Sequence, residues 1–206
     1  MALATMALVG SAAAVVQADD DEGGSKSDRP ACVTPTGGDD DSPGGDDRND
    51  DGARDSAVSD DHEGTDSDDE AKGDSGDDEL YGNNGDDDLQ GEDGDDDLCG
   101  DDGDDELDGG HGDDRMSGGQ GDDVIRGDDG DDDEFGEAGD DRLSGGTGRD
   151  LLVGGKGRDR ISAGAGRDVV RARDGRRDVI RCGAGTDRVK ADRQDSVASD
   201  CESVSR

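Results

Sequence analysis

The sequence carries a nine-residue period that runs without insertion from residue 73 to residue 171. Aligned in nines, this segment reads GDSGDDELY, GNNGDDDLQ, GEDGDDDLC, GDDGDDELD, GGHGDDRMS, GGQGDDVIR, GDDGDDDEF, GEAGDDRLS, GGTGRDLLV, GGKGRDRIS and AGAGRDVVR. Position 4 is Gly and position 6 is Asp in all eleven repeats, and position 8 is Leu, Met, Ile or Val in ten. The exception at position 8 is Glu134, which Phe135 follows. Such a period predicts a stack of similar units, each in contact mainly with its neighbours.

Each repeat predicts one turn followed by one short strand. Glycines at positions 1 and 4 permit the positive backbone angles of tight turns. Positions 7 to 9 place one apolar residue between polar neighbours, which is typical of a short strand with its central side chain facing inward. Two repeats would complete one coil, and stacked coils would form two parallel sheets around the position-8 side chains. The expected fold class is therefore all-β, a parallel β-roll (a two-sheet β-helix or solenoid of nine-residue repeats).

Composition limits what could hold such a stack together. The chain has 61 acidic against 22 basic residues, a formal net charge of −39 and only 25% apolar residues. Too little surface can be buried to offset the entropy of ordering a conventional globular domain. After coiling, position-6 aspartates two repeats apart would lie about 5 Å from each other and repel. A divalent cation between turns would reverse that repulsion, and flexible loops with oxygen ligands favour Ca²⁺ over Mg²⁺. The acidic surface argues against nucleic acid as a partner.

The repeats resemble the G-G-x-G-x-D-x-U-x nonapeptide of RTX, or hemolysin-type calcium-binding, proteins, over about half of the chain. The resemblance implies a parallel β-roll with calcium ions between turns, held by position-6 carboxylates and loop carbonyls two repeats apart. Carried over by position, the metal ligands would be Asp78, Asp87, Asp96, Asp105, Asp114, Asp123, Asp132, Asp141, Asp150, Asp159 and Asp168. Pairing each with the aspartate two repeats later gives five sites on one edge and four on the other, at most nine ions.

Two positions depart from a uniform repeat. Glycine at position 2 is replaced by Asp74, Asn83, Glu92, Asp101, Asp128 and Glu137, which predicts altered geometry or weaker calcium sites near those turns. Position 5 is Asp in the first eight repeats and Arg149, Arg158 and Arg167 in the last three. This change is either drift among exposed positions or Arg–Asp pairing that lets the last coils form with less calcium and nucleate the others.

The segments before the repeats predict export. Residues 1–18 form an apolar, small-residue run followed by acidic residues, which indicates a secretory signal peptide although no Lys or Arg precedes the run. Residues 19–72 contain all three prolines and predict an acidic disordered spacer, in which 64–72 is a degenerate repeat. The expected location is secreted and extracellular, by the general pathway, with no membrane insertion after signal removal.

Residues 172–206 predict a C-terminal capping segment. The period slips after Arg171, and Val179, Ile180, Val189 and Val197 suggest two or three short strands. A stack needs such a cap to close its open core. Cys182 and Cys201 are placed to form a disulfide within the cap. Cys32 lies in the spacer and Cys99 at an outward repeat position, which disfavours their pairing and leaves either one free or joined to another chain.

The sequence does not predict an enzyme. His62 and His111 are the only histidines, no catalytic motif is present, and no stretch outside the roll could house a catalytic core. An EF-hand loop starting at Asp104 would need Glu at its twelfth position, where Arg115 stands. We expect a secreted calcium ion binding protein whose repeats fold into a rigid roll on binding Ca²⁺. The alternative is a calcium-dependent cell-surface or extracellular-matrix structural or adhesion module of unknown partner. A disordered acidic buffer of cations is opposed by the in-phase aliphatic residues.

Overall fold

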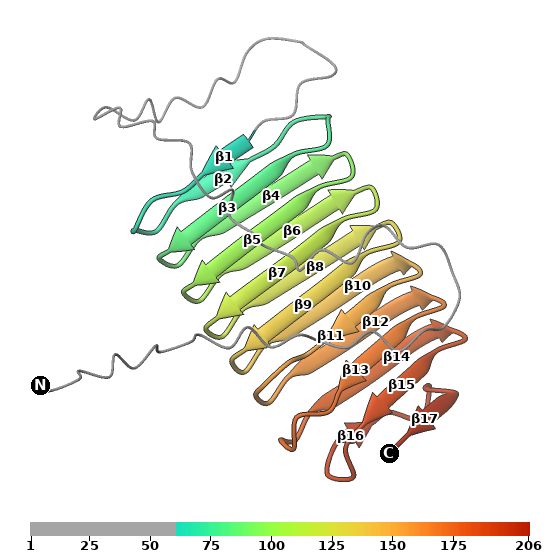
Figure 1. The fold of residues 1–206 in the computed structure, drawn as a ribbon. Coiled ribbons are helices and arrows are strands. Elements are labelled where there is room, and N and C mark those ends of the chain that lie inside the picture. Colours follow the sequence, from blue (N-terminus) through green and yellow to red (C-terminus); the bar gives the residue numbers. More distant parts are fainter. Residues whose placement is uncertain (1–60) are drawn as a thin grey trace, which may run out of the picture.

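The computed structural model describes residues 61–206, which form seventeen β-strands and no helix in two parallel sheets (Figure 1). The nine-stranded sheet contains β1 Asp61–Glu63, β3 Glu79–Asn84, β5 Asp97–Asp102, β7 Arg115–Gln120, β9 Asp133–Ala138, β11 Leu151–Val153, β13 Val169–Ala172, β15 Arg188–Ala191 and β17 Ser203–Ser205. The eight-stranded sheet contains β2 Glu70–Lys72, β4 Asp88–Asp93, β6 Glu106–His111, β8 Val124–Asp129, β10 Arg142–Gly148, β12 Arg160–Gly166, β14 Val179–Gly185 and β16 Ser196–Val197. Successive strands alternate between the sheets, so two repeats complete one coil of a two-sheet β-solenoid of about eight turns. The predicted fold class is confirmed.

The nine-residue period sets the register of both sheets. Leu80 aligns with Leu98 in the nine-stranded sheet, and Leu89 aligns with Leu107 in the eight-stranded sheet. The same offset of two repeats holds through the regular part of the chain, because each coil consumes two repeats. Equivalent side chains therefore stack directly above one another along the solenoid.

One inward side chain from each repeat forms the core. The position-8 residues are all 2% exposed or less: Leu80, Leu89, Leu98, Leu107, Met116, Ile125, Glu134, Leu143, Leu152, Ile161 and Val170. Ile180 continues this series in the eight-stranded sheet, and Val189 continues it in the nine-stranded sheet. The core is consequently thin, with one stacked column of side chains from each sheet, as the spacing predicts.

The strands are longer than the predicted three residues. β4, for example, runs from position 7 of one repeat to position 3 of the next, and its pairing register omits Gly91 at position 1. Positive φ angles fall at position 2, as at Glu92 (77°), and at position 4, as at Gly94 (152°). The prediction of a positive φ at position 1 is wrong. Glycine is needed there for space, since a β-carbon on Gly91 would lie 2.2 Å from Oδ2 of Asp96.

Both ends of the regular repeats continue the solenoid. Residues 64–72 follow the path of a repeat, because β2 pairs with β4 and aligns Ala71 with Leu89. At the other end Val170 aligns with Val189, which lies one position beyond two full repeats, so a single extra residue is accommodated in the intervening segment. The expected short strands are present as β14, β15 and β16, with β17 in addition.

The cysteines divide into one expected and one unexpected case. Cys182 and Cys201 are disulfide-bonded. Cys99 is also disulfide-bonded and only 3% exposed, so a free thiol at an outward position is wrong for this residue. Cys32, the predicted signal peptide 1–18 and the spacer up to residue 60 lie outside the described residues. Within the described part of the chain, no helix has the length and apolar character to cross a membrane.

Candidate metal centre

The position-6 aspartates form two buried columns, one preceding the strands of each sheet. All eleven predicted ligands are 2% exposed or less. The backbone N–H of each donates to Oδ1 of the aspartate in the next coil, as from Asp87 to Asp105 (2.9 Å) and from Asp105 to Asp123 (3.0 Å). The sequence places these carboxylates here because the glycine turn directly before each strand brings position 6 to the same point in every coil.

The second oxygen of most of these carboxylates has no hydrogen-bond partner among residues 61–206. Oδ2 is buried without such a partner in ten of the eleven predicted aspartates. The exception is Asp78, whose Oδ2 accepts the backbone N–H of Asp74 at 2.9 Å. A buried polar atom without a partner costs roughly 1–3 kcal/mol, and here the same atom recurs in every coil. The columns therefore present a regular series of carboxylate oxygens that need a positively charged or hydrogen-bonding partner.

Backbone carbonyls lie close to these oxygens. At Gly100, a β-carbon would lie 2.2 Å from Oδ2 of Asp105 and 2.7 Å from the carbonyl oxygen of Gly118 in the next coil. The same two kinds of oxygen surround Gly73, Gly82, Gly91, Gly127 and Gly136. Glycine at position 1 thus lets the carboxylate pack beside the backbone, where carboxylate and carbonyl oxygens from successive coils come together.

Burial raises the pKa of ten of the eleven predicted ligands, from Asp87 to Asp168. Desolvation raises the pKa of Asp123 to about 6, that of Asp105 to about 7 and that of Asp141 to about 8. The backbone N–H bond to each carboxylate opposes the rise, and neighbouring carboxylates such as Asp123 beside Asp105 add to it. A cation bound in the columns would therefore compete with protons near neutral pH.

A second ladder of aspartates at position 5 lies in solvent and runs in the opposite direction. The N–H of Asp104 donates to Oδ1 of Asp86 (3.0 Å), and the N–H of Asp122 donates to Oδ1 of Asp104 (2.7 Å). These exposed carboxylates order the turns, but solvent can satisfy their remaining oxygens.

The change from Asp to Arg at position 5 forms one ion pair. Arg149 donates through its backbone N–H (2.8 Å) and its Nε (2.9 Å) to Asp131, and the hydrogen bonds from Arg149 lower the pKa of that carboxyl. Arg158 donates its N–H to Asp140 at 2.9 Å. Neither Arg158 nor Arg167 forms an ion pair within residues 61–206. One ion pair thus supports the hypothesis that the last coils need less calcium. The hypothesis stays a prediction.

The columns extend beyond the predicted residues. The N–H of Asp69 donates to Asp87, that of Asp159 to Asp178, and that of Asp168 to Asp187. Asp178 and Asp187 are 1% and 0% exposed, and each has a buried Oδ2 without a partner. The G-x-D spacing at 185–187 could have identified Asp187, whereas Asp178 follows the inserted residue and breaks that spacing.

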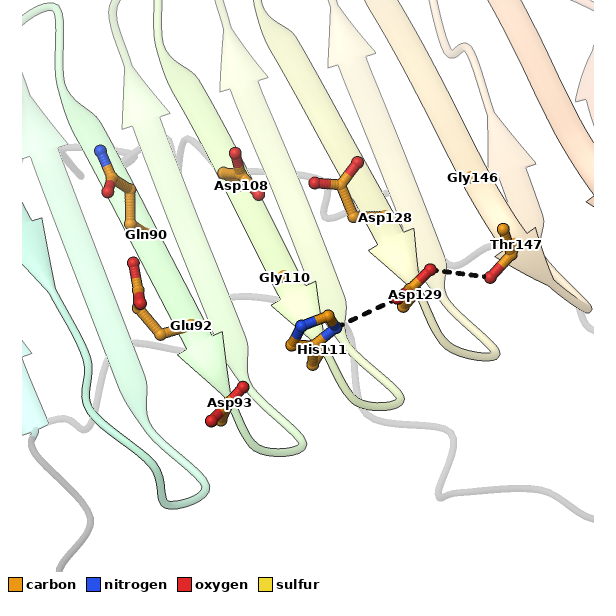
Figure 2. Close-up of a pocket in the computed structure, with 10 residues that line it drawn as sticks. All are labelled: Gln90, Glu92, Asp93, Asp108, Gly110, His111, Asp128, Asp129, Gly146 and Thr147. Atoms are coloured by element: carbon orange, nitrogen blue, oxygen red, sulfur yellow. Dashed lines mark hydrogen bonds and ion pairs between the residues drawn. The ribbon is translucent and has the colours of Figure 1, made fainter.

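A separate groove on the eight-stranded sheet contains exposed and half-buried polar groups (Figure 2). It crosses β4, β6, β8 and β10. Glu92 and Asp128 flank Gly110 in the pairing register, and Asp108 aligns with Gln90. His111 lies 3.2 Å through Nδ1 from Asp129, which also accepts a hydrogen bond from Thr147 (3.0 Å). The side chain of His111 is 69% exposed.

The geometry limits how a cation could be held. Among residues 61–206, no three His, Cys, Asp or Glu side chains are arranged to surround a metal ion. A cation in a column would need carboxylates of successive coils together with backbone carbonyls. Such an oxygen-only set of flexible ligands fits Ca²⁺ better than Mg²⁺ or Zn²⁺.

A parallel two-sheet solenoid with one buried aspartate in each nine-residue repeat defines a class of repeat proteins whose turns are suited to binding cations. A family model described as RTX calcium-binding nonapeptide repeat (4 copies) matches residues 63–98, 100–134 and 135–170. The chain belongs to this family, whose repeat is a structural calcium-binding motif and not a catalytic one. No curated protein matches the chain.

Proposed function

We propose that the protein is a secreted calcium-binding protein whose solenoid forms as Ca²⁺ binds. The observation that carries the proposal is the buried, unpartnered Oδ2 that recurs along both aspartate columns. Membership of the RTX repeat family supports calcium as the cation. Bound calcium would supply the positive charge that these carboxylates lack.

The residues that would hold calcium are the eleven position-6 aspartates, to which Asp178 and Asp187 add one coil at the C-terminal end. Backbone carbonyls of position-1 glycines lie beside them. The regular repeats would hold at most about nine ions, from the pairing of aspartates two repeats apart.

Folding on calcium binding follows from the balance of forces in the roll. The core contains one inward side chain in each repeat, while the chain carries a net charge of −39. Without a cation, each coil adds another buried carboxylate that must ionise or hold a proton. Calcium binding would therefore supply much of the folding free energy.

The remaining parts of the function follow from family and sequence. RTX repeat proteins are typically secreted, and the predicted signal peptide 1–18 agrees with export. The protein acts by binding calcium and not as an enzyme, because its repeats are structural and the two histidines belong to no catalytic motif.

Two adjacent aspartates provide a direct test of the columns. Asp123 is fully buried with an unpartnered Oδ2, whereas Asp122 is exposed, and each also accepts a backbone N–H through Oδ1. Asp123→Asn keeps the Oδ1 acceptor and removes the charge, and should weaken calcium-driven folding by about 3 kcal/mol, the scale for losing one partner of a buried charge pair. Calorimetric titration should show fewer bound ions for Asp123→Asn and the wild-type number for Asp122→Asn. Equal calcium binding by the two variants would contradict the proposal.

A further inference from the structure

Part of the outer face of the nine-stranded sheet is buried although it points away from the core. Ser117, at position 9 of its repeat, is 6% exposed. Ser144 and Ser162 occupy the same repeat position in the eight-stranded sheet, and both are exposed. Ser117 aligns with Cys99 and Phe135, whereas Ser144 aligns with Arg126 and Ser162, so the difference reflects both the neighbouring side chains and what lies over each sheet.

The burial extends across the next two strands on one side of β7. Tyr81 aligns with Cys99, which aligns with Ser117, on β3, β5 and β7. Tyr81 is 8% exposed and Cys99 is 3% exposed. We call Tyr81, Cys99 and Ser117 the outer patch. Residues 61–206 form only the two sheets, and no strand among them packs over this patch.

The disulfide of Cys99 indicates which part of the chain covers the outer patch. Cys182 and Cys201 are bonded to each other, and Cys99 is bonded as well. The chain has four cysteines, so Cys32 is the one that remains. Roughly 30 residues separate Cys32 from β1, and β1 and β5 are two strands apart in one sheet, about 10 Å. The connecting chain is long enough to reach Cys99.

We propose that residues 29–35, RPACVTP, lie across the outer patch and are tied to it by a disulfide between Cys32 and Cys99. Residues 31–33 are the longest apolar run between residues 19 and 60, and Pro30 and Pro35 at its two ends favour an extended backbone. The exposed acidic side chains of Glu79 and Asp97 on β3 and β5 suit Arg29 at the start of this segment. In this proposal residues 29–35 attach the N-terminal segment to one face of the roll.

Formation of the bond is a two-electron oxidation. The thiols of Cys32 and Cys99 lose two protons and two electrons as the S–S bond forms, and a disulfide-exchange oxidant is reduced to two thiols. Such oxidants act in the oxidising compartments where exported proteins fold. The link closes the long loop between Cys32 and Cys99 in the calcium-free chain and so favours folding about 1,000-fold. Because about nine ions bind as the roll folds, a gain in folding of about 1,000-fold corresponds to about a twofold lower calcium concentration at the midpoint of folding.

The first test is peptide mapping of the full-length, calcium-loaded protein without reduction. We expect one peptide pair joined through Cys32 and Cys99, and a second pair joined through Cys182 and Cys201. Cys32→Ser should remove only the first pair and raise the calcium midpoint of folding about twofold. Alkylation of Cys32 in the unreduced protein, or a link from Cys99 to a second chain, would overturn the proposal.

The second test measures coverage of the outer patch independently of the disulfide. The chain has one Tyr and no Trp, so its intrinsic fluorescence reports Tyr81 alone. Acrylamide is neutral and is not repelled by the acidic surface. We expect Ala31→Asp with Val33→Asp to increase the quenching constant of calcium-loaded full-length protein at least twofold. The matched double variant Ala57→Asp with Val58→Asp should quench like the wild type. Equal quenching of all three proteins would show that another element covers Tyr81.

Discussion

Glu134 is the one acidic residue among the position-8 side chains that form the hydrophobic core. It is 0% exposed, and neither carboxylate oxygen has a hydrogen-bond partner within residues 61–206. Burial, followed by the nearby Asp150 and Asp132, raises its pKa well above the usual range. The backbone N–H groups of Ser144 and Gly127 oppose this rise without reaching hydrogen-bond geometry. Burial therefore favours the neutral, protonated form of Glu134, and this unsatisfied group destabilises the middle of the stack.

Glu134→Leu should stabilise the calcium-loaded roll by about 2 kcal/mol, because it removes an unsatisfied buried group and matches the neighbouring core residues. Thermal unfolding in saturating calcium should show a higher midpoint. Glu134→Gln keeps the shape and the polar burial, so its midpoint should stay near that of the wild type. A midpoint for Glu134→Leu at or below the wild-type value would contradict this account of the core.

At the residue scale, the sequence predicted the eleven column aspartates but not their limits. Strict spacing identified Asp78 to Asp168, since every coil has the same length there. Asp178 follows an inserted residue, and only the three-dimensional path shows that it occupies the same place. The burial of Cys99 was not predictable either, because the repeat pattern says nothing about what lies over the outer face of a sheet.

At the scale of the strand and its turn, position 2 is where the repeats store backbone strain. Asn83, Glu92, Asp101, Asp128 and Glu137 all have φ between 67° and 77°. A β-carbon in the left-handed region costs roughly 1–2 kcal/mol, with less for Asn and Asp. Repeats with glycine at position 2, such as those with Gly146 and Gly155, avoid this strain.

Glu137→Gly should therefore stabilise the roll by about 1 kcal/mol, whereas Glu137→Ala removes the same charge and keeps the strained β-carbon. The difference between the two variants isolates the backbone contribution from the electrostatic one. Denaturant unfolding in saturating calcium measures it. Equal stability of the two variants would show that the left-handed angle at residue 137 carries no strain.

The sequence predicted the role of the turn glycines at position 4 but not at position 1. Glycine at position 4 takes a positive φ in seven of the eleven repeats, for example at Gly103, where a β-carbon would lie 1.6 Å from the carbonyl oxygen of Gly85. Glycine at position 1 is required instead by the carboxylate that packs against it. A sequence shows that glycine is present, but not whether the backbone angle or the space requires it.

At the scale of the molecule, the two columns make the calcium-free roll sensitive to pH. Burial raises the pKa of Asp123, Asp105 and Asp141 to about 6, 7 and 8, against about 3.9 in an unfolded chain. At a pH above the unfolded pKa of about 3.9 and below the folded pKa, each of these carboxylates holds a proton in the roll that it has released in the unfolded chain. This contribution to stability is therefore full below about pH 4 and is lost as the pH rises towards 8.

We accordingly expect the chain in excess chelator to show more β-roll circular dichroism at pH 5 than at pH 8. The transition should lie between about pH 6 and pH 8, where the folded-state carboxylates titrate. The same pH series in saturating calcium serves as the control and should retain the roll at pH 8. A calcium-free chain that gains structure as the pH rises would contradict the direction of these pKa shifts.

The roll has a thin core with one inward side chain in each repeat, in a chain whose net charge is −39, and we propose that calcium binding makes it fold. Circular dichroism of the full-length protein at pH 7.5, during titration with Ca²⁺ and separately with Mg²⁺, tests this claim most directly. We expect a large cooperative gain of β structure on adding millimolar Ca²⁺ and none with equal Mg²⁺. A spectrum that Ca²⁺ leaves unchanged, whether already folded or still unfolded, would contradict it.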